Sequence, residues 1–218
     1  MGILGGTFDP IHLGHLRPAV EVRQALALDH VRLMPARVSP LRDAPETPGG
    51  HRLAMVQAAL ADSGAPDLLA DGRELDRPGP SYTADTLVEL ADDLRAARFH
   101  LIVGADAFAS FDRWQRWPEI LERAHVVVTH RPGMTLVVPD AVRARVTHDA
   151  TDLAQRGAGC VLVQPVSQLD ISATAIREAA AAGRDLRYWV PESVRRYIGE
   201  HHLYQRSEMS PDADRSAG

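Results

Sequence analysis

The sequence predicts an α/β fold, a Rossmann-like, open, mostly parallel sheet with helices on both faces. Short apolar runs alternate with helical patterns along the 218 residues, which is typical of βαβ units. The later runs are continuously apolar, as strands covered on both faces are. The first run ends in two glycines and leads into a helical pattern, as do the ligand-binding turns of such folds.

The expected strands cover residues 2–4, 31–34, 68–70, 101–103, 126–129 and 161–164. The expected helices cover residues 16–28, 50–62, 83–95, 114–123, 174–182 and 191–201. Proline is tolerated in the first turn of a helix, so Pro18 predicts that the first helix begins near His15. Residues 36–49 are rich in proline and long for a connection, which favours a functional loop. Residues 133–158 are expected to be irregular, with room for a short helix.

The length predicts a single domain over residues 1–205, with a helical C-terminal part from about residue 172. The polar residues 206–218 are expected to form a disordered tail. A formal net charge of −5 provides no basic surface, which argues against a nucleic-acid-binding module. All 24 basic residues are arginines, so a cation that binds phosphate must be Arg or His, beside backbone N–H groups.

One cysteine, Cys160, excludes a disulfide within the chain and is expected to be a buried structural thiol. No apolar stretch reaches 18 residues, and the first residues do not form a signal-peptide pattern. We therefore expect a cytoplasmic protein that does not contact a membrane. The sequence leaves open whether it forms a homo-oligomer.

The first turn carries the strongest chemical signal. Gly5 and Gly6 let the backbone approach a ligand closely, and the following helix N-terminus favours an anion. Thr7, His12 and His15 add side-chain donors, and histidines three residues apart share one helix face. This combination favours phosphoryl or nucleotidyl transfer, in which a protein positions reactants and stabilises negative charge.

Two other interpretations of the histidines stay open. They could bind a metal ion together with Asp9, although H-x-x-H alone is a weak metal signature. They could also be capping and packing residues of the first helix.

Five blocks of the sequence resemble one family in order. They are residues 5–15 (GGTFDPIHLGH), residues 81–87 (SYTADTL) after Glu74 and Arg77, residues 104–106 (GAD) followed by Phe111, Trp114 and Trp117, residues 131–133 (RPG), and residues 171–177 (ISATAIR). Together they resemble the bacterial nicotinate-nucleotide adenylyltransferases of the H-x-G-H nucleotidyltransferase superfamily, over residues 1–204. The S-Y-T-x-D-T and W-x-x-W blocks narrow the resemblance from the superfamily to this family.

The resemblance implies transfer of AMP from ATP to nicotinate mononucleotide in NAD biosynthesis, giving nicotinate adenine dinucleotide and pyrophosphate. The nucleophile is the phosphate of the substrate, so the enzyme needs none of its own. Mg²⁺ is expected to arrive with ATP and to keep most of its waters, so no protein residue is assigned to a metal.

The resemblance also assigns residues to roles. Catalysis is assigned to His12, His15 and Arg42. ATP binding is assigned to Gly5, Gly6, Thr7, Phe8, His12, His15, Gly104, Asp106, Ser172, Thr174 and Arg177. Nicotinate mononucleotide binding is assigned to Thr7, Arg42, Thr83, Trp114 and Arg131. In the loop of residues 36–49 the family typically shows P-H-K or P-H-R, where this chain has Pro40, Leu41 and Arg42.

Structural alternatives stand beside these roles. Ser172 and Thr83 suit helix N-caps, and the two tryptophans could pack in the core. An Arg in the first turn opposes the helix dipole, a conflict that a polyphosphate at Arg177 would resolve. Arg52 could be structural or contact phosphate.

Rival functions are adenylyl transfer to nicotinamide mononucleotide or to phosphopantetheine, and a regulator that binds ATP without turnover. The sequence does not decide between nicotinate and nicotinamide.

Overall fold

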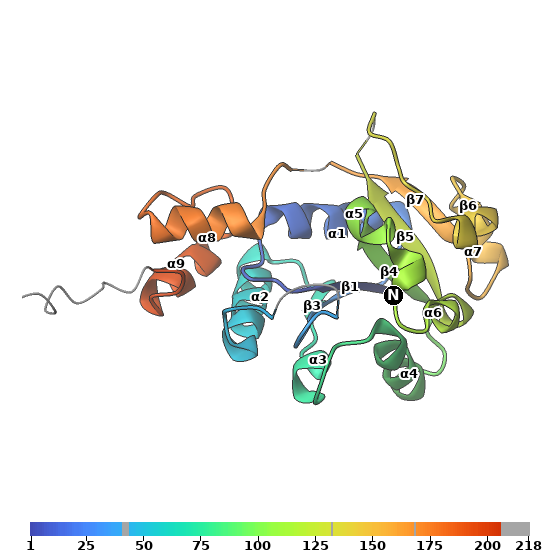
Figure 1. Ribbon diagram of the computed structural model, residues 1–218, viewed down its shortest axis with the longest axis horizontal. Helices are drawn as coiled ribbons and strands as arrows, with labels where there is room; N and C mark the ends of the chain where they lie inside the picture. The colour runs from blue at the N-terminus through green and yellow to red at the C-terminus, as the bar shows by residue number, and fades with distance from the viewer. Residues whose placement is uncertain (41–43, 132, 168, 206–218) are drawn as a thin grey trace, which may run out of the picture.

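The computed structural model describes residues 1–40, 44–131, 133–167 and 169–205 (Figure 1). Within these residues, seven parallel strands form one sheet in the order β3-β2-β1-β4-β5-β7-β6. The strands are β1 (Gly2–Gly6), β2 (Val31–Pro35), β3 (Leu68–Ala70), β4 (Phe99–Gly104), β5 (Ala124–His130), β6 (Val146–Thr147) and β7 (Val161–Pro165). The predicted fold class is confirmed.

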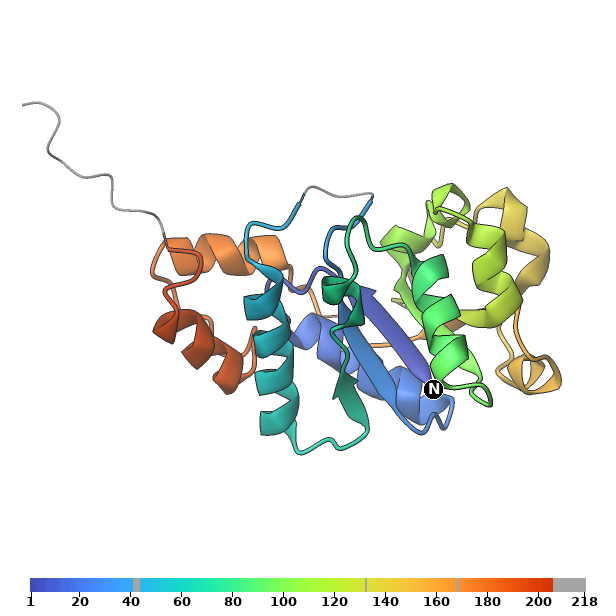
Figure 2. The same cartoon turned by 90° about the horizontal axis from the view of Figure 1, so that it is seen from below.

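Helices cover both faces of the sheet. They are α1 (Leu13–Ala25), α2 (Gly49–Ser63), α3 (Arg73–Asp76), α4 (Thr83–Asp93), α5 (Ala105–Phe108), α6 (Trp117–Arg123), α7 (Thr151–Gln155), α8 (Ala173–Ala181) and α9 (Glu192–Glu200), with 3₁₀ turns η1 (Phe111–Arg113) and η2 (Asp140–Arg145). Residues of α1, α2, α8 and α9 form one core with Ile102 and Val127, and Figure 2 shows α8 and α9 beside α2. Residues of α4, α5 and α6 form the other core with Leu101 and Val126. Neighbouring residues of one strand therefore serve opposite cores.

The strand order places a topological switch point between β1 and β4. The chain passes from β1 outward to β2 and β3, then returns to β4 on the other side of β1. Ligands of open α/β sheets bind at such a point, beyond the carboxyl ends of the strands. Gly5 and Gly6 end β1 there, and Gly104 ends β4.

Two helix predictions are wrong. The first helix begins at Leu13, earlier than expected, and keeps Pro18 inside it. Its first turn is fixed by the Leu13 N–H, which donates to the Trp189 carbonyl at 3.0 Å, and by the His15 N–H, which donates to the His12 carbonyl at 2.9 Å. The expected helix over residues 114–123 begins only at Trp117, as α6, because Arg116 has a left-handed φ of 54°, which a right-handed helix does not accommodate.

The remaining differences are short elements. Sequence periodicity missed α3 and α5. The stretch expected to be irregular contains η2 and β6, together with α7, which agrees with the expected short helix. Elements of two to six residues are too short to show a period. Cys160 is a buried free thiol, as predicted. Within the described residues, no helix is both long and apolar enough for a membrane span. The expected tail at residues 206–218 lies outside the described residues.

Candidate functional site

The first βα turn combines an open backbone with a packed aromatic ring. Gly5 is exposed, and a Cβ atom built on it would meet nothing within 4 Å. Phe8 has a left-handed φ of 49° and is 1% exposed. Its ring would lie 2.9 Å from a Cβ on Gly6, and its edge meets the His15 ring at a centroid distance of 5.1 Å. Gly6 is therefore needed to seat Phe8, and Gly5 leaves space for a ligand.

The two histidines of the turn lie against each other. The ring centroids of His12 and His15 are 3.7 Å apart, with 31° between the ring planes. His12 is 4% exposed, and its Nδ1 atom has no hydrogen-bond partner among the described residues. Burial lowers the pKa of His12 to about 4, so the ring is neutral at pH 7. A neutral ring carries one N–H donor.

A second helix N-terminus closes on the same place. A Cβ atom on Gly14 would lie 2.9 Å from Nδ1 of His12 and 3.3 Å from the carbonyl oxygen of Ile171, the residue before the N-cap of α8. The glycine of the H-x-G-H motif thus lets α8 approach α1. Two helix N-termini that converge in this way favour an anion between them.

The N-terminal turn of α8 is tied to the first turn of the sheet. The Ser172 side chain caps α8 by accepting from the Ala175 N–H at 3.1 Å, so the predicted capping alternative is correct for this residue. Arg177 donates from Nη1 to the Asp9 carbonyl at 2.9 Å and from Nη2 to Oγ1 of Thr174 at 3.4 Å. Capping and phosphate binding are compatible, because a guanidinium has five donors and Thr174 is exposed.

The metal and capping alternatives for the histidines lose support, whereas the packing alternative agrees with the contact between the two rings. His12 occupies the N-cap position of α1, but its side chain makes no capping hydrogen bond. Oδ1 of Asp9 accepts a hydrogen bond from the Tyr204 hydroxyl at 2.6 Å, which engages the proposed third metal ligand. Within the described residues, no three His, Cys, Asp or Glu side chains are grouped as metal ligands would be.

The two blocks assigned to nicotinate mononucleotide meet on the other side of the sheet. Asp85 of α4 forms an ion pair with Arg116, which lies between the two tryptophans. Thr83 is the first residue of α4, and the N-cap is Tyr82, so Thr83 is not the predicted cap. The neighbouring Thr86 is buried and donates to Glu74 at 2.6 Å, so part of this block is structural.

Both tryptophans pack against Phe111. The ring centroids of Trp114 and Trp117 are 5.3 Å and 6.2 Å from that of Phe111. Both indoles are half-buried at the edge of the second core, which agrees with the packing alternative. Nε1 of Trp114 is buried without a hydrogen-bond partner among the described residues, so this indole has an unused donor.

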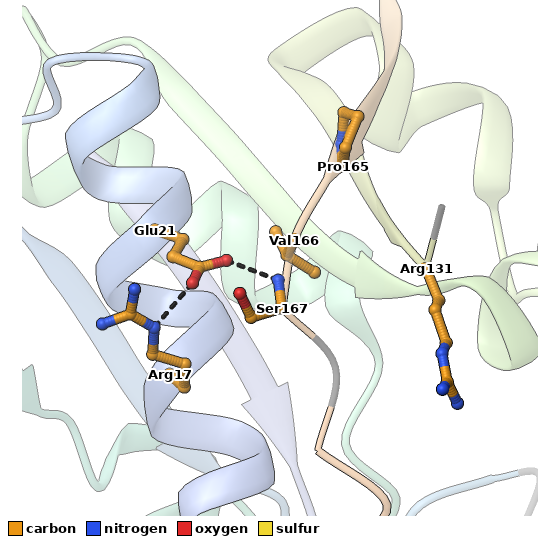
Figure 3. A pocket seen from close by; sticks show the side chains of 6 residues that line it. All are labelled: Arg17, Glu21, Arg131, Pro165, Val166 and Ser167. Carbon is orange, nitrogen blue, oxygen red and sulfur yellow. Dashed lines mark hydrogen bonds and ion pairs between the residues drawn. The ribbon is translucent and has the colours of Figure 1, made fainter. Parts of the chain in front are cut away.

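Arg131 lies apart from these residues. It follows β5 and lines an open pocket with Arg17 and Glu21 of α1 and with residues 165–167 (Figure 3). Glu21 accepts from the Ser167 N–H and from Nε of Arg17, each at 2.6 Å, which fixes the wall of this pocket. The pocket is on the α1 side of the sheet, whereas Thr83 and Trp114 are on the α4 side. Sequence order alone does not separate the two sides.

The remaining predicted residues are placed as follows. Gly104 is the exposed N-cap of α5, and Asp106 is exposed in its first turn, both beside the switch point. Arg42 lies outside the described residues. Two residues that sequence reasoning did not assign, Arg52 and Tyr204, bond directly to the first turn. Tyr204 gives no local sequence signal, because its partner is 195 positions away.

Comparison with known proteins adds the family. The cytidylyltransferase-like family model matches residues 3–179. A probable nicotinate-nucleotide adenylyltransferase of Halorhodospira halophila is 49% identical over 208 residues, 94% of each chain. Another, from Pseudomonas syringae pv. tomato, is 42% identical over 221 residues, covering 99% of this chain and 96% of the relative. The chain belongs to the nicotinate-nucleotide adenylyltransferase family.

Solved structures of adenylyltransferases share the fold. A Plasmodium falciparum nicotinic acid mononucleotide adenylyltransferase complexed with NaAD matches with a TM-score of 0.71 at 17% identity, over 93% of this chain and 96% of the other. A putative nicotinate-nucleotide adenylyltransferase from Vibrio parahaemolyticus matches with a TM-score of 0.63 at 19% identity, over 94% and 95%. At such low sequence identity these matches concern the fold alone. Membership of the adenylyltransferase family rests on the relatives that are 42–49% identical.

Proposed function

We propose that this adenylyltransferase transfers AMP from ATP to nicotinate mononucleotide, releasing pyrophosphate and nicotinate adenine dinucleotide. The observation that carries the proposal is the convergence of two helix N-termini, α1 and α8, on the stacked His12 and His15 at the switch point. The names of the relatives, which match over nearly the whole chain, support the same substrate pair.

In this proposal the ATP phosphates lie between the two helix N-termini. The backbone of Gly5, Gly6, Thr7 and Phe8 lines one side, and Ser172, Thr174 and Arg177 line the other. The adenosine lies toward Gly104 and Asp106, whose carboxylate is free to accept from a ribose hydroxyl.

Nicotinate mononucleotide lies toward the α4 side. The pyridine ring stacks on Trp114, and stacking on an indole contributes favourably to the free energy of binding. The N–H of Trp114, which is buried without a partner among the described residues, and the hydroxyl of Thr83 are the donors assigned to that end. The assignments of Arg42 and Arg131 to this substrate stay predictions.

The chemistry needs no base from the protein. The phosphate of nicotinate mononucleotide is ionised at pH 7 and attacks the α-phosphorus of ATP in line, while pyrophosphate leaves. His12 is neutral and donates its N–H to the charge that develops on the phosphate oxygens, together with His15 and Arg177. Because these donors are held by the fold before substrate binds, little reorganisation opposes the transition state.

The donor set around the turn fits Mg²⁺ that enters with ATP. It consists of imidazoles, guanidinium groups and backbone N–H groups, and the nearest buried carboxylate, that of Asp9, is bonded to Tyr204. Mg²⁺ prefers oxygen ligands and keeps its waters. The oxygens of the ATP phosphates, in place of protein side chains, would therefore supply most of its other ligands. When bound, the ion would neutralise charge on the leaving pyrophosphate.

The test compares three acceptors. Pyrophosphate release is measured with Mg·ATP and equal concentrations of nicotinate mononucleotide, nicotinamide mononucleotide or phosphopantetheine. Preference for the first is the expected result. Preference for another acceptor would keep adenylyl transfer and overturn the substrate, and ATP binding without release from any acceptor would favour the regulator.

A further inference from the structure

Arg52 carries a charged side chain that is fully buried. It lies in the first turn of α2, is 1% exposed and is among the largest fully buried side chains. In the part of the chain that the structure describes, no carboxylate lies within ion-pair distance of Arg52, although the charge of buried Asp9 acts on it. Burying a guanidinium costs free energy unless its N–H donors are satisfied. The hydrogen bonds of Arg52 therefore indicate its role.

Arg52 makes four hydrogen bonds to described residues, and each of them goes to a backbone carbonyl. Nη1 donates to the carbonyl of Thr7 at 2.6 Å and to that of Ala36 at 2.7 Å. Nε donates to the Thr47 carbonyl at 3.0 Å, and Nη2 donates to the Arg37 carbonyl at 3.4 Å. One rigid group therefore joins the first turn of the sheet, the segment after β2 and the entry to α2.

These contacts link the two substrate sides of the site. Thr7 belongs to the turn that carries the backbone assigned to ATP. The Arg37 N–H donates to Oγ of Ser81 at 2.9 Å, and the Ser81 N–H donates to the Val38 carbonyl at 2.9 Å. Ser81 lies two residues before Thr83, so a chain of hydrogen bonds runs from the ATP turn through Arg52 to the N-terminus of α4.

We propose that Arg52 is a positioning residue for adenylyl transfer, which fixes the first turn relative to the segment after β2 without touching substrate. The inference rests on the proposed function. The positions of the four carbonyls require a planar, forked guanidinium group, because its donors must reach separate segments at once. A lysine ammonium is a single point with three donors and cannot span the same carbonyls.

The experiment compares Arg52→Lys and Arg52→Ala with a control, Arg32→Ala. Arg32 lies on β2, is partly buried and bonds to Asp71, away from the first turn. In Arg52→Lys we expect kcat to fall by about 10-fold or more, because misplaced reactants react more slowly. The changes in KM for both substrates should be smaller. We expect Arg32→Ala to lower the melting temperature and leave kcat unchanged.

Chemical rescue separates positioning from general loss of stability. Guanidinium ions added at millimolar concentration should restore part of kcat in Arg52→Ala, and the same concentration of sodium chloride should not. The ions should give no increase in wild type or in Arg32→Ala. A kcat of wild-type size in Arg52→Lys, or absence of rescue in a folded Arg52→Ala, would overturn the inference.

Amide hydrogen exchange supplies a readout that does not depend on turnover. In Arg52→Lys, exchange should rise in residues 6–9 and 36–38 and stay unchanged in the β4–β5 region. Unchanged exchange in the first two segments would contradict the inference even if activity falls. Wild-type protein that makes no dinucleotide would instead contradict the proposed function, and exchange would still decide whether Arg52 holds the two segments.

Discussion

The hydroxyl group of Tyr204 donates a hydrogen bond to Oδ1 of Asp9, with 2.6 Å between the two oxygens. Asp9 is buried in the first turn, and its backbone carbonyl accepts from Arg177. Burial and the bond to Asp9 both raise the pKa of Tyr204, so the hydroxyl keeps its proton. The segment after α9 thus closes on the turn that carries the histidines.

Tyr204→Phe should destabilise the fold. The change removes only the hydroxyl and leaves a buried carboxylate oxygen without its donor, which costs about 1–3 kcal/mol. Urea unfolding measures the loss. Tyr188→Phe is the matched control, because Tyr188 is 86% exposed, and its unfolding should be unchanged. An equal loss in both variants would show that the bond to Asp9 contributes nothing specific.

Gly14→Ala should impair turnover in a folded protein. The new methyl group would press on the His12 ring and on the Ile171 carbonyl, which moves the two helix N-termini apart. We expect kcat to fall by about 10-fold or more. Gly50→Ala, also in a helix but with open space around its Cβ, is the control and should behave as wild type. Normal turnover in Gly14→Ala would mean that the approach of α8 is dispensable.

Trp114→Ala should weaken binding of one substrate selectively. Loss of an aromatic stack worth about 0.5–1.5 kcal/mol would raise KM for nicotinate mononucleotide by up to about 10-fold. KM for ATP in the same variant is the internal control and should change little. A parallel rise in both constants would indicate a packing role for Trp114 alone.

Acid should destabilise the fold through the half-buried His100 and the buried His125, at the opposite end of the sheet. Burial lowers the pKa of His100 to about 4 and also lowers that of His125, whose ring lies 5.4 Å away. In the unfolded chain these histidines bind protons near pH 6.5, whereas in the folded protein they bind them only at lower pH. The free energy of unfolding therefore falls as the pH drops from 6.5 toward 4. The buried His12 contributes in the same direction.

Denaturant unfolding at pH 7.5 and pH 5 measures this effect. His100→Gln should reduce the loss of stability between the two pH values by about 1–2 kcal/mol. His148→Gln is a suitable control, because His148 is exposed in the loop that follows β6. An identical pH dependence in wild type and His100→Gln would contradict the burial argument.

The sheet was predictable from sequence because its strands are local patterns. Strands such as β4 and β5 are apolar on both faces, and that pattern gives their position within two residues of the observed ends. The helix predicted over residues 114–123 was begun too early, since nothing local shows that Arg116 adopts a left-handed conformation. The conformation is accompanied by an ion pair with Asp85, 31 residues earlier in the chain.

The candidate site was predictable to a different degree for different residues. The H-x-G-H turn is a continuous motif, so His12 and His15 could be named from the sequence alone. That Arg131 lies on the α1 side, and that Arg52 and Tyr204 bond to the turn, depends on contacts across 45 and 195 positions and on the order of the strands. No periodicity or spacing encodes such contacts.

The most direct test of the central claim is a single-turnover measurement of nicotinate adenine dinucleotide formation by wild type and His15→Ala, with ATP binding measured in both. The account predicts that the variant folds, binds ATP and forms the dinucleotide about 10²-fold or more slowly, because a donor to the transition-state charge is lost. Dinucleotide formation at the wild-type rate in His15→Ala would contradict it.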